Sequence, residues 1–235
     1  MQITMDDVVK YYQELDMKKK IYLLIDATLF VVLMNFIEAV LMPGYWIKSL
    51  IKFIYIVLSV VVYCGLFKKR FNEAVYFNKA KLPWVFYAGL VGVYILFIIG
   101  FLLVKDYLNI SEIENSLLIK ENITKQNCLY VFTYIIVINS LLEEIFFRGL
   151  IFHGFDNRLI SYLVSGISFS LYHLSMIANW GNAFIFVLML VLLFIASVVL
   201  QIFSLHFNSL KASYLIHAIS NLAINSLGFY IIYFM

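Results

Sequence analysis

Long apolar runs alternate with short polar segments along this chain. A membrane-spanning helix needs about 20 mostly apolar residues. The runs that meet this rule lie at about 21–42, 47–67, 82–104, 128–155, 159–178, 182–204 and 210–234. The pattern predicts an all-α transmembrane helix bundle of about seven spans. Because no internal repeat and no polar tract interrupts it, residues 1–235 are expected to form a single membrane-embedded domain.

Basic residues predict the orientation of the bundle. Residues 1–20 are too polar and too acidic for a signal peptide and are typical of an interfacial or cytoplasmic segment. With this end inside, the inner segments hold most of the basic residues, including the group at 68–70, and the outer segments hold fewer, among them Lys48 and Lys52. Positive residues favour the cytoplasmic side. The N-terminus is therefore predicted to be cytoplasmic and the loop 105–127 external.

Composition agrees with a membrane location. In 235 residues, 64% are hydrophobic and 13% are charged, and this leaves too little polar surface for a soluble globule. The net charge of +3 is modest and falls in loops, so a nucleic-acid partner is not expected. Cys64 and Cys128 lie in apolar runs without C-x-x-C spacing, so neither a disulfide framework nor a thiolate metal site is indicated. We expect a multi-pass protein whose first partner is the lipid bilayer.

Few polar side chains remain inside the predicted spans, and each is informative, since an ionisable group in hydrocarbon is costly unless paired or hydrated. Three spans carry them: Glu143, Glu144 and Arg148 on the first, His173 on the second, His217 and Asn221 on the third. Counted from the predicted cytoplasmic ends at about 1.5 Å per residue, Glu143, His173 and Asn221 lie roughly 17–21 Å deep. The three spans are therefore predicted to present polar groups to one shared pocket.

A structural reading competes with a functional one for some of these residues. Glu144 and Arg148 are four residues apart on one helix face and can form an ion pair that holds helices together. Glu143 points about 100° away and cannot share that pair. Phe169, four residues before His173, is by itself an ordinary core aromatic. A single intramembrane histidine is usually a packing residue, but two at the level of an extra carboxylate favour a functional site.

The polar residues form three ordered motifs: E-E-x-x-x-R at 143–148, F-x-x-x-H at 169–173 and H-x-x-x-N at 217–221. Together they resemble the CPBP family of intramembrane proteases, named for CAAX proteases and bacteriocin processing and also called the Abi family. The resemblance covers about residues 128–225. It implies an intramembrane endopeptidase, and because the family's prenyl proteases usually have eight spans, it raises the expected count to seven or eight.

Hydrolysis of a peptide bond needs an activated water, a stabilised oxyanion and a proton for the leaving amine. A carboxylate in a low-dielectric cavity can act as the general base, and Glu143 suits that role. His173 can orient the same water, while His217 and Asn221 can donate hydrogen bonds to the oxyanion. These roles match what the resemblance implies. Glu144, Arg148 and Phe169 are then expected to support the catalytic residues.

Zinc is the alternative, because the family was long described as metalloproteases. Glu143, His173 and His217 can ligate Zn²⁺ with water in the open position. No H-E-x-x-H pair places two histidines on one helix, which favours a metal-free site without a cofactor.

Other protease classes fit less well. A rhomboid-like site needs G-x-S-G, and the nearest match, residues 166–169, lacks the second glycine; an aspartyl site needs two intramembrane aspartates, and only Asp26 is available. The rival function is a transporter or an immunity protein that binds a peptide without cutting it. Pro43 and Pro83 lie at span boundaries, so no span is broken in the manner of a transporter, but a binding-only role stays open.

The substrate class is less constrained. The resemblance offers a prenylated C-terminus, a bacteriocin or pheromone precursor, or a membrane anchor. A composition rich in Ile, Phe, Tyr, Lys and Asn is typical of an AT-rich bacterial genome. It favours the bacterial plasma membrane, peptide processing or self-immunity, and a peptide-export transporter as a further partner.

Overall fold

Every apolar run predicted to span the membrane is helical in the structure, a computed structural model that describes residues 5–234, with side chains from residue 13 onward. The longer helices are α1 (Met5–Phe36, continued by the π-helical turn η1, Ile37–Leu41), α2 (Tyr45–Phe67), α4 (Trp84–Val104), α8 (Arg158–Tyr172), α10 (Ala183–His206) and α11 (Leu210–Phe234). Short helices connect them: α3 (Phe71–Val75), η2 (Lys105–Tyr107), α5 (Ile110–Asn115), η3 (Ser116–Lys120) and α9 (Leu174–Ile177). No β-strand occurs in residues 5–234, so the all-α prediction is confirmed for this range.

The first motif lies on a helical run that changes its winding. Adjoining pieces follow one another without a break: α6 (Cys128–Tyr134), η4 (Ile135–Asn139), α7 (Ser140–Glu144) and η5 (Ile145–Phe152), of which η4 and η5 are π-helical. Wider π turns are rare, and they occur frequently at functional sites. Here they flank the two glutamates.

Within the described residues, length and apolarity support membrane crossing for five helical segments: Gln13–Leu41, Tyr45–Phe67, Trp84–Tyr107, Ala183–His206 and Leu210–Phe234. The run 128–152 carries three charged side chains, and α8 has 15 residues, fewer than the roughly 20 of a full span. A total of seven or eight spans and a cytoplasmic N-terminus therefore stay predictions.

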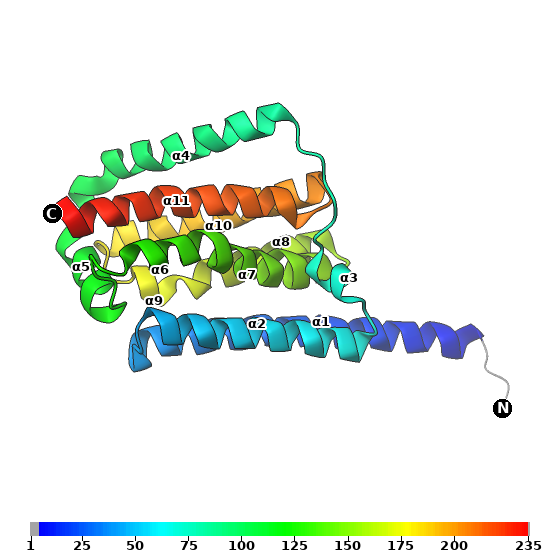
Figure 1. Ribbon diagram of the computed structural model, residues 1–235. Coiled ribbons are helices and arrows are strands. Elements are labelled where there is room, and N and C mark those ends of the chain that lie inside the picture. Colours follow the sequence, from blue (N-terminus) through cyan, green and yellow to red (C-terminus); the bar gives the residue numbers. More distant parts are fainter. Residues whose placement is uncertain (1–4, 235) are drawn as a thin grey trace.

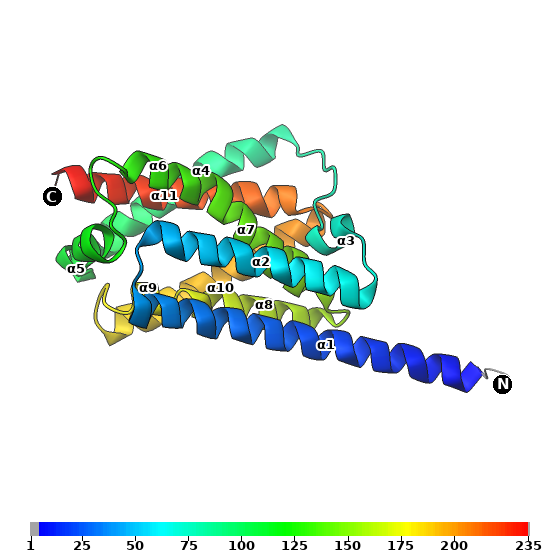
Figure 2. The ribbon, with the colours of Figure 1, turned by 60° about the horizontal axis from the view of Figure 1, so that its bottom comes forward.

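The helices form a bundle with the first motif at its centre (Figure 1). α1 and α2 lie on one side, α4 lies on the opposite side against α11, and the run from α6 to η5 passes between them. In the turned view the N-terminal part of α1 extends beyond the other helices (Figure 2). α7 packs against α11, and α8 packs against both α1 and α10. This arrangement brings the three motif-bearing segments together.

Aromatic packing fixes the helices around the first motif. Phe30 of α1 lies 4.4 Å from Phe146 of η5, measured between ring centroids, and Phe147 lies 5.2 Å from Phe169 of α8. All four side chains are buried. Such ring pairs contribute about 0.5–1.5 kcal/mol each beyond the area that they bury.

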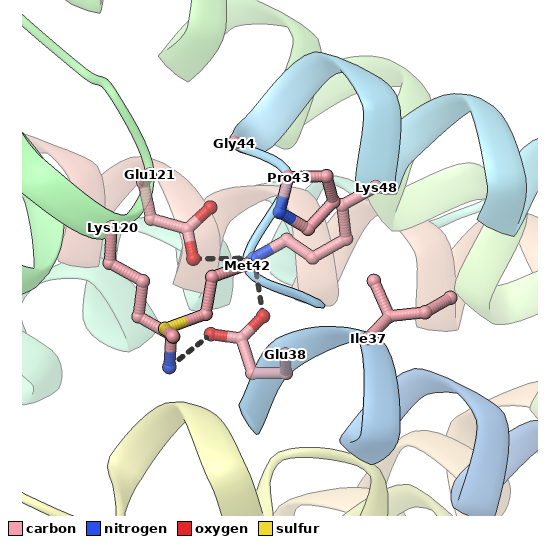
Figure 3. Close-up of a pocket in the computed structure, with 8 residues that line it drawn as sticks. All are labelled: Ile37, Glu38, Met42, Pro43, Gly44, Lys48, Lys120 and Glu121. Carbon is pink, nitrogen blue, oxygen red and sulfur yellow. Dashed lines mark hydrogen bonds and ion pairs between the residues drawn. The ribbon is translucent and has the colours of Figure 1, made fainter. Parts of the chain in front are cut away.

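An ionic cluster lies beside the turn between α1 and α2, at one end of the bundle in Figure 1; Figure 3 shows its side chains. Lys48 Nζ lies 2.5 Å from Glu38 Oε2 and also pairs with Glu121, while Lys120 Nζ lies 2.9 Å from Glu38 Oε1. In addition, the Tyr45 backbone N–H donates to the Glu121 carbonyl at 3.1 Å. The cluster thus ties the loop predicted to be external to the turn between α1 and α2.

Gly149→Ala is expected to destabilise the protein by about 1–3 kcal/mol, because a Cβ there would lie 2.8 Å from the Val75 carbonyl oxygen and 3.1 Å from that of Ala74. The measurement is the thermal unfolding midpoint in detergent. Gly92→Ala in α4 is the matched control, since nothing lies within 4 Å of its Cβ and alanine favours the helix. Equal midpoints for Gly149→Ala and wild type would show that α3 does not approach η5 this closely.

Candidate active site

Glu143 lies at the centre of the site, on α7, and its side chain is 2% exposed. Its Oε1 atom accepts hydrogen bonds from Asn139 Nδ2 at 2.8 Å and from the Tyr172 hydroxyl at 3.0 Å. Lys52 Nζ of α2 donates to the same oxygen at 3.2 Å. One oxygen of the carboxylate is therefore surrounded by donors from three helical segments.

The other oxygen of Glu143 faces His217 of α11. Oε2 lies 3.6 Å from His217 Nε2, which is too long for a direct hydrogen bond. On the far side of the ring, Nδ1 lies 2.9 Å from Glu144 Oε1. Because an ionised carboxylate only accepts hydrogen bonds, Nδ1 carries the hydrogen. In the neutral ring, Nε2 is then an acceptor that points toward Glu143.

Glu144 and Arg148 form the ion pair that their spacing predicts. Arg148 Nη1 lies 3.1 Å from Glu144 Oε1, and both side chains are fully buried. Arg148 also donates to Ser197 Oγ at 3.0 Å and stacks over Phe169 with 4.4 Å between the guanidinium carbon and the ring centroid. Since Glu144 also accepts from His217, it both neutralises Arg148 and orients the histidine.

His173 caps the C-terminus of α8 and joins the site through Phe169. Its Nδ1 donates to the Phe169 carbonyl at 2.8 Å, so Nε2 is the free ring nitrogen. The Phe169 ring lies 4.8 Å from the His173 ring and 5.7 Å from the His217 ring. Phe169 therefore contacts both histidines, and among the described residues no hydrogen bond links His173 directly to Glu143.

Asn221 lies one turn beyond His217 on α11. Its Nδ2 donates to Ser140 Oγ of α7 at 2.8 Å. Within residues 13–234 it makes no hydrogen bond to Glu143 or His217. The structure thus places Asn221 beside the glutamate–histidine pair, and its part in oxyanion stabilisation stays a prediction.

Three residues of the site escaped the sequence analysis: Lys52, Asn139 and Tyr172. Lys52 is an ionisable residue within the apolar run 47–67, which is itself a signal of function, although its charge also fits a basic residue near the external side. Asn139 precedes Glu143 by four residues and shares its helix face. Tyr172 adjoins His173, and no sequence pattern singles it out.

The zinc alternative fits this arrangement poorly. Among the described residues no three histidine, cysteine, aspartate or glutamate side chains are placed to hold a metal ion. The Lys52 ammonium also lies against Oε1 of Glu143, where it would repel a cation. Glu143, His173 and His217 therefore do not form a zinc site here, and we derive no step through a metal.

Comparison with protein families agrees with the motifs. Residues 125–223 match the family model described as type II CAAX prenyl endopeptidase Rce1-like. The matched range includes every motif residue from Glu143 to Asn221, whereas Lys52 lies outside it. Comparisons with curated proteins and with solved structures found no match. Residues 125–223 are therefore similar to the Rce1-like group of the CPBP family, the family of intramembrane proteases that the three motifs resemble.

Proposed function

We propose that this protein is an intramembrane endopeptidase that hydrolyses a peptide bond of a membrane-associated peptide or protein with water activated by Glu143. The observation that carries the proposal is the 3.6 Å separation of Glu143 Oε2 and His217 Nε2. Both groups are held on their other sides, Glu143 by three donors and His217 by Glu144. A single water molecule that hydrogen-bonds to both Glu143 Oε2 and His217 Nε2 is the simplest way to bridge these two atoms.

The tautomer of His217 defines how this water is held. Oε2 of Glu143 and Nε2 of neutral His217 both accept, so the water donates one hydrogen to each. Its lone pairs are then free to attack a substrate carbonyl. As the oxygen bonds to the carbonyl carbon, Glu143 takes a proton from the water. Glu143 then delivers that proton to the amine nitrogen as the C–N bond breaks.

The oxyanion needs donors that are not already used. Asn221 donates one of its two Nδ2 hydrogens to Ser140 Oγ, and the second is available for another acceptor. We assign that second hydrogen to the oxyanion, where one donor is worth roughly 3–4 kcal/mol. His217 suits the water better than the oxyanion, because its neutral Nε2 has no hydrogen to donate. His173, with its free Nε2, is assigned to orientation of the water or of the substrate.

A matched pair of peptides tests the function and the substrate class together. The purified protein in liposomes is incubated with a farnesylated CAAX-type peptide and with the same peptide lacking the farnesyl group, and the products are identified by mass spectrometry. We expect endoproteolytic cleavage. Faster cleavage of the farnesylated peptide would indicate that the substrates are proteins with prenylated C-termini. Equal rates for the two peptides would show that the prenyl group is not recognised and would favour unmodified precursors of the bacteriocin or pheromone kind. Binding of both peptides without cleavage would contradict the proposal and favour an immunity protein.

A further inference from the structure

Lys52 belongs to α2, outside the region that matches the protease family, and yet its side chain reaches Glu143. We propose that Lys52 is a positioning residue for the hydrolysis: its ammonium, acting with Asn139 and Tyr172, fixes Oε1 of Glu143 and leaves Oε2 as the only oxygen free to activate water. This inference rests on the proposed function.

The geometry around Lys52 satisfies an ammonium group. The side chain is 6% exposed, and Nζ donates to Asn139 Oδ1 at 2.6 Å, to Glu143 Oε1 at 3.2 Å and to the Tyr172 hydroxyl oxygen. A lysine ammonium has three hydrogens, so each hydrogen has its own oxygen. A lysine present only for packing would not need three buried acceptors from three other helical segments, η4, α7 and α8.

The hydrogen bonds around Lys52 all lead to one atom, Oε1 of Glu143. Asn139 accepts from Lys52 through Oδ1 and donates to Glu143 Oε1 through Nδ2, at 2.8 Å. Tyr172 accepts from Lys52 and donates its own hydrogen to the same Oε1 at 3.0 Å. Oε1 thus receives three hydrogen bonds, and the carboxylate cannot rotate without breaking all of them. Oε2 is therefore held toward His217.

Charge compensation leads to the same conclusion. Glu143 and Glu144 are adjacent and both buried, so each ionised form needs a nearby cation. Arg148 of the same helical run compensates Glu144, whereas His217, neutral in the proposed mechanism, lies between the two carboxylates without compensating either. Lys52 is the cation that contacts Glu143. Without it, Glu143 would take up a proton and could no longer act as a base.

Lys48 offers a matched control one helical turn away on α2. It is also ion-paired and mostly buried, but its partners are Glu38 and Glu121 in the ionic cluster at the end of the bundle. Among the described residues it makes no hydrogen bond or ion pair with Glu143. Lys48→Met and Lys52→Met therefore remove the same charge from the same helix, and only the second affects the site.

The kinetic test compares these variants in liposomes on a peptide that the wild type cleaves. Lys52→Met is expected to lower kcat on the order of 100-fold with little change in KM, because the base is misplaced while substrate contacts remain. Lys52→Arg, which keeps the charge, should recover part of that loss. Tyr172→Phe keeps the ring and removes only the linking hydroxyl, and it should lower kcat roughly fivefold. Lys48→Met should stay near wild type.

A second readout does not depend on cleavage. A hydrophobic carbodiimide modifies protonated carboxyl groups, and tandem mass spectrometry locates the label. Glu143 should be labelled in Lys52→Met and not in the wild type or in Lys48→Met, while Glu144, still paired with Arg148, serves as the internal reference. Labelling of Glu143 in Lys52→Met with no cleavage by the wild type would reject the proposed function and leave the positioning of Glu143 intact.

The proposal is overturned if Lys52→Met retains wild-type kcat and leaves Glu143 unlabelled. If Lys52→Met does not fold, Tyr172→Phe and Lys52→Arg are used instead to test whether the Lys52 network positions Glu143. Wild-type kcat and an unlabelled Glu143 in Tyr172→Phe would then overturn it, whereas a kcat loss in Tyr172→Phe at an unchanged unfolding temperature would support it.

Discussion

Loss of peptide cleavage in a protein that still folds is the expected result of Glu143→Gln. The amide keeps the shape of the side chain, and its oxygen still accepts from Asn139 and Tyr172, but it cannot take a proton from water. General-base catalysis typically contributes 10²- to 10⁴-fold, so we expect a loss on the order of 10³-fold in kcat. The measurement is single-turnover cleavage with the unfolding temperature recorded in parallel.

Glu38→Gln is the matched control for this experiment. Glu38 is also a buried carboxylate with lysine partners, Lys48 and Lys120, but it lies in the ionic cluster away from Glu143. Both variants replace a buried carboxylate by an amide and weaken an ion pair, so a general loss of stability would appear in both. Equal activity of the two variants would show that Glu143 takes no part in the reaction.

Arg148→Ala is expected to have the largest effect on stability. The fully buried Glu144 would lose its cation, Ser197 would lose one of its two hydrogen-bond donors, and the Phe169 ring would lose the guanidinium that stacks on it. Removing one partner of a buried ion pair typically costs about 3–5 kcal/mol. We expect low yield of inserted protein and a much lower unfolding temperature in detergent.

Arg158→Ala is the matched control, because it shows how much stability is lost when an arginine outside the buried ion pair is removed. Arg158 is exposed at the start of α8, and its guanidinium carbon lies 5.9 Å from the centroid of the Phe152 ring. Its removal should change stability by less than about 1 kcal/mol. Unchanged yield and unchanged unfolding temperature in Arg148→Ala would contradict the buried pair.

Spacing along a single helix predicted part of the site correctly. Glu144 and Arg148, four residues apart, form the expected pair, and Glu143 points elsewhere. Apolar length predicted the helical ranges, because the need to satisfy the backbone in a bilayer leaves little alternative to a helix. Depth counted from the span ends also predicted that the third polar span presents its polar residues to the pocket of Glu143, and His217 of that span faces Glu143.

Contacts between helices could not be predicted in the same way, because depth does not determine how each helix is rotated. The Lys52 ammonium points from α2 to Glu143, and His217 uses Glu144 as well as facing Glu143. Asn221 donates to Ser140, a contact that its sequence spacing does not predict, and its part in oxyanion stabilisation stays a prediction. Each of these contacts follows from the rotation of one helix against another, and this is decided by packing of the whole bundle.

The most direct test of the central claim is cleavage in ¹⁸O-labelled water by wild type, Glu143→Gln and Glu38→Gln, each with a strong chelator present. The account predicts that wild type and Glu38→Gln place one ¹⁸O atom in the new carboxyl terminus and that Glu143→Gln leaves the peptide intact. Cleavage that persists in Glu143→Gln, or wild-type cleavage that is lost with the chelator and restored by zinc, would contradict it.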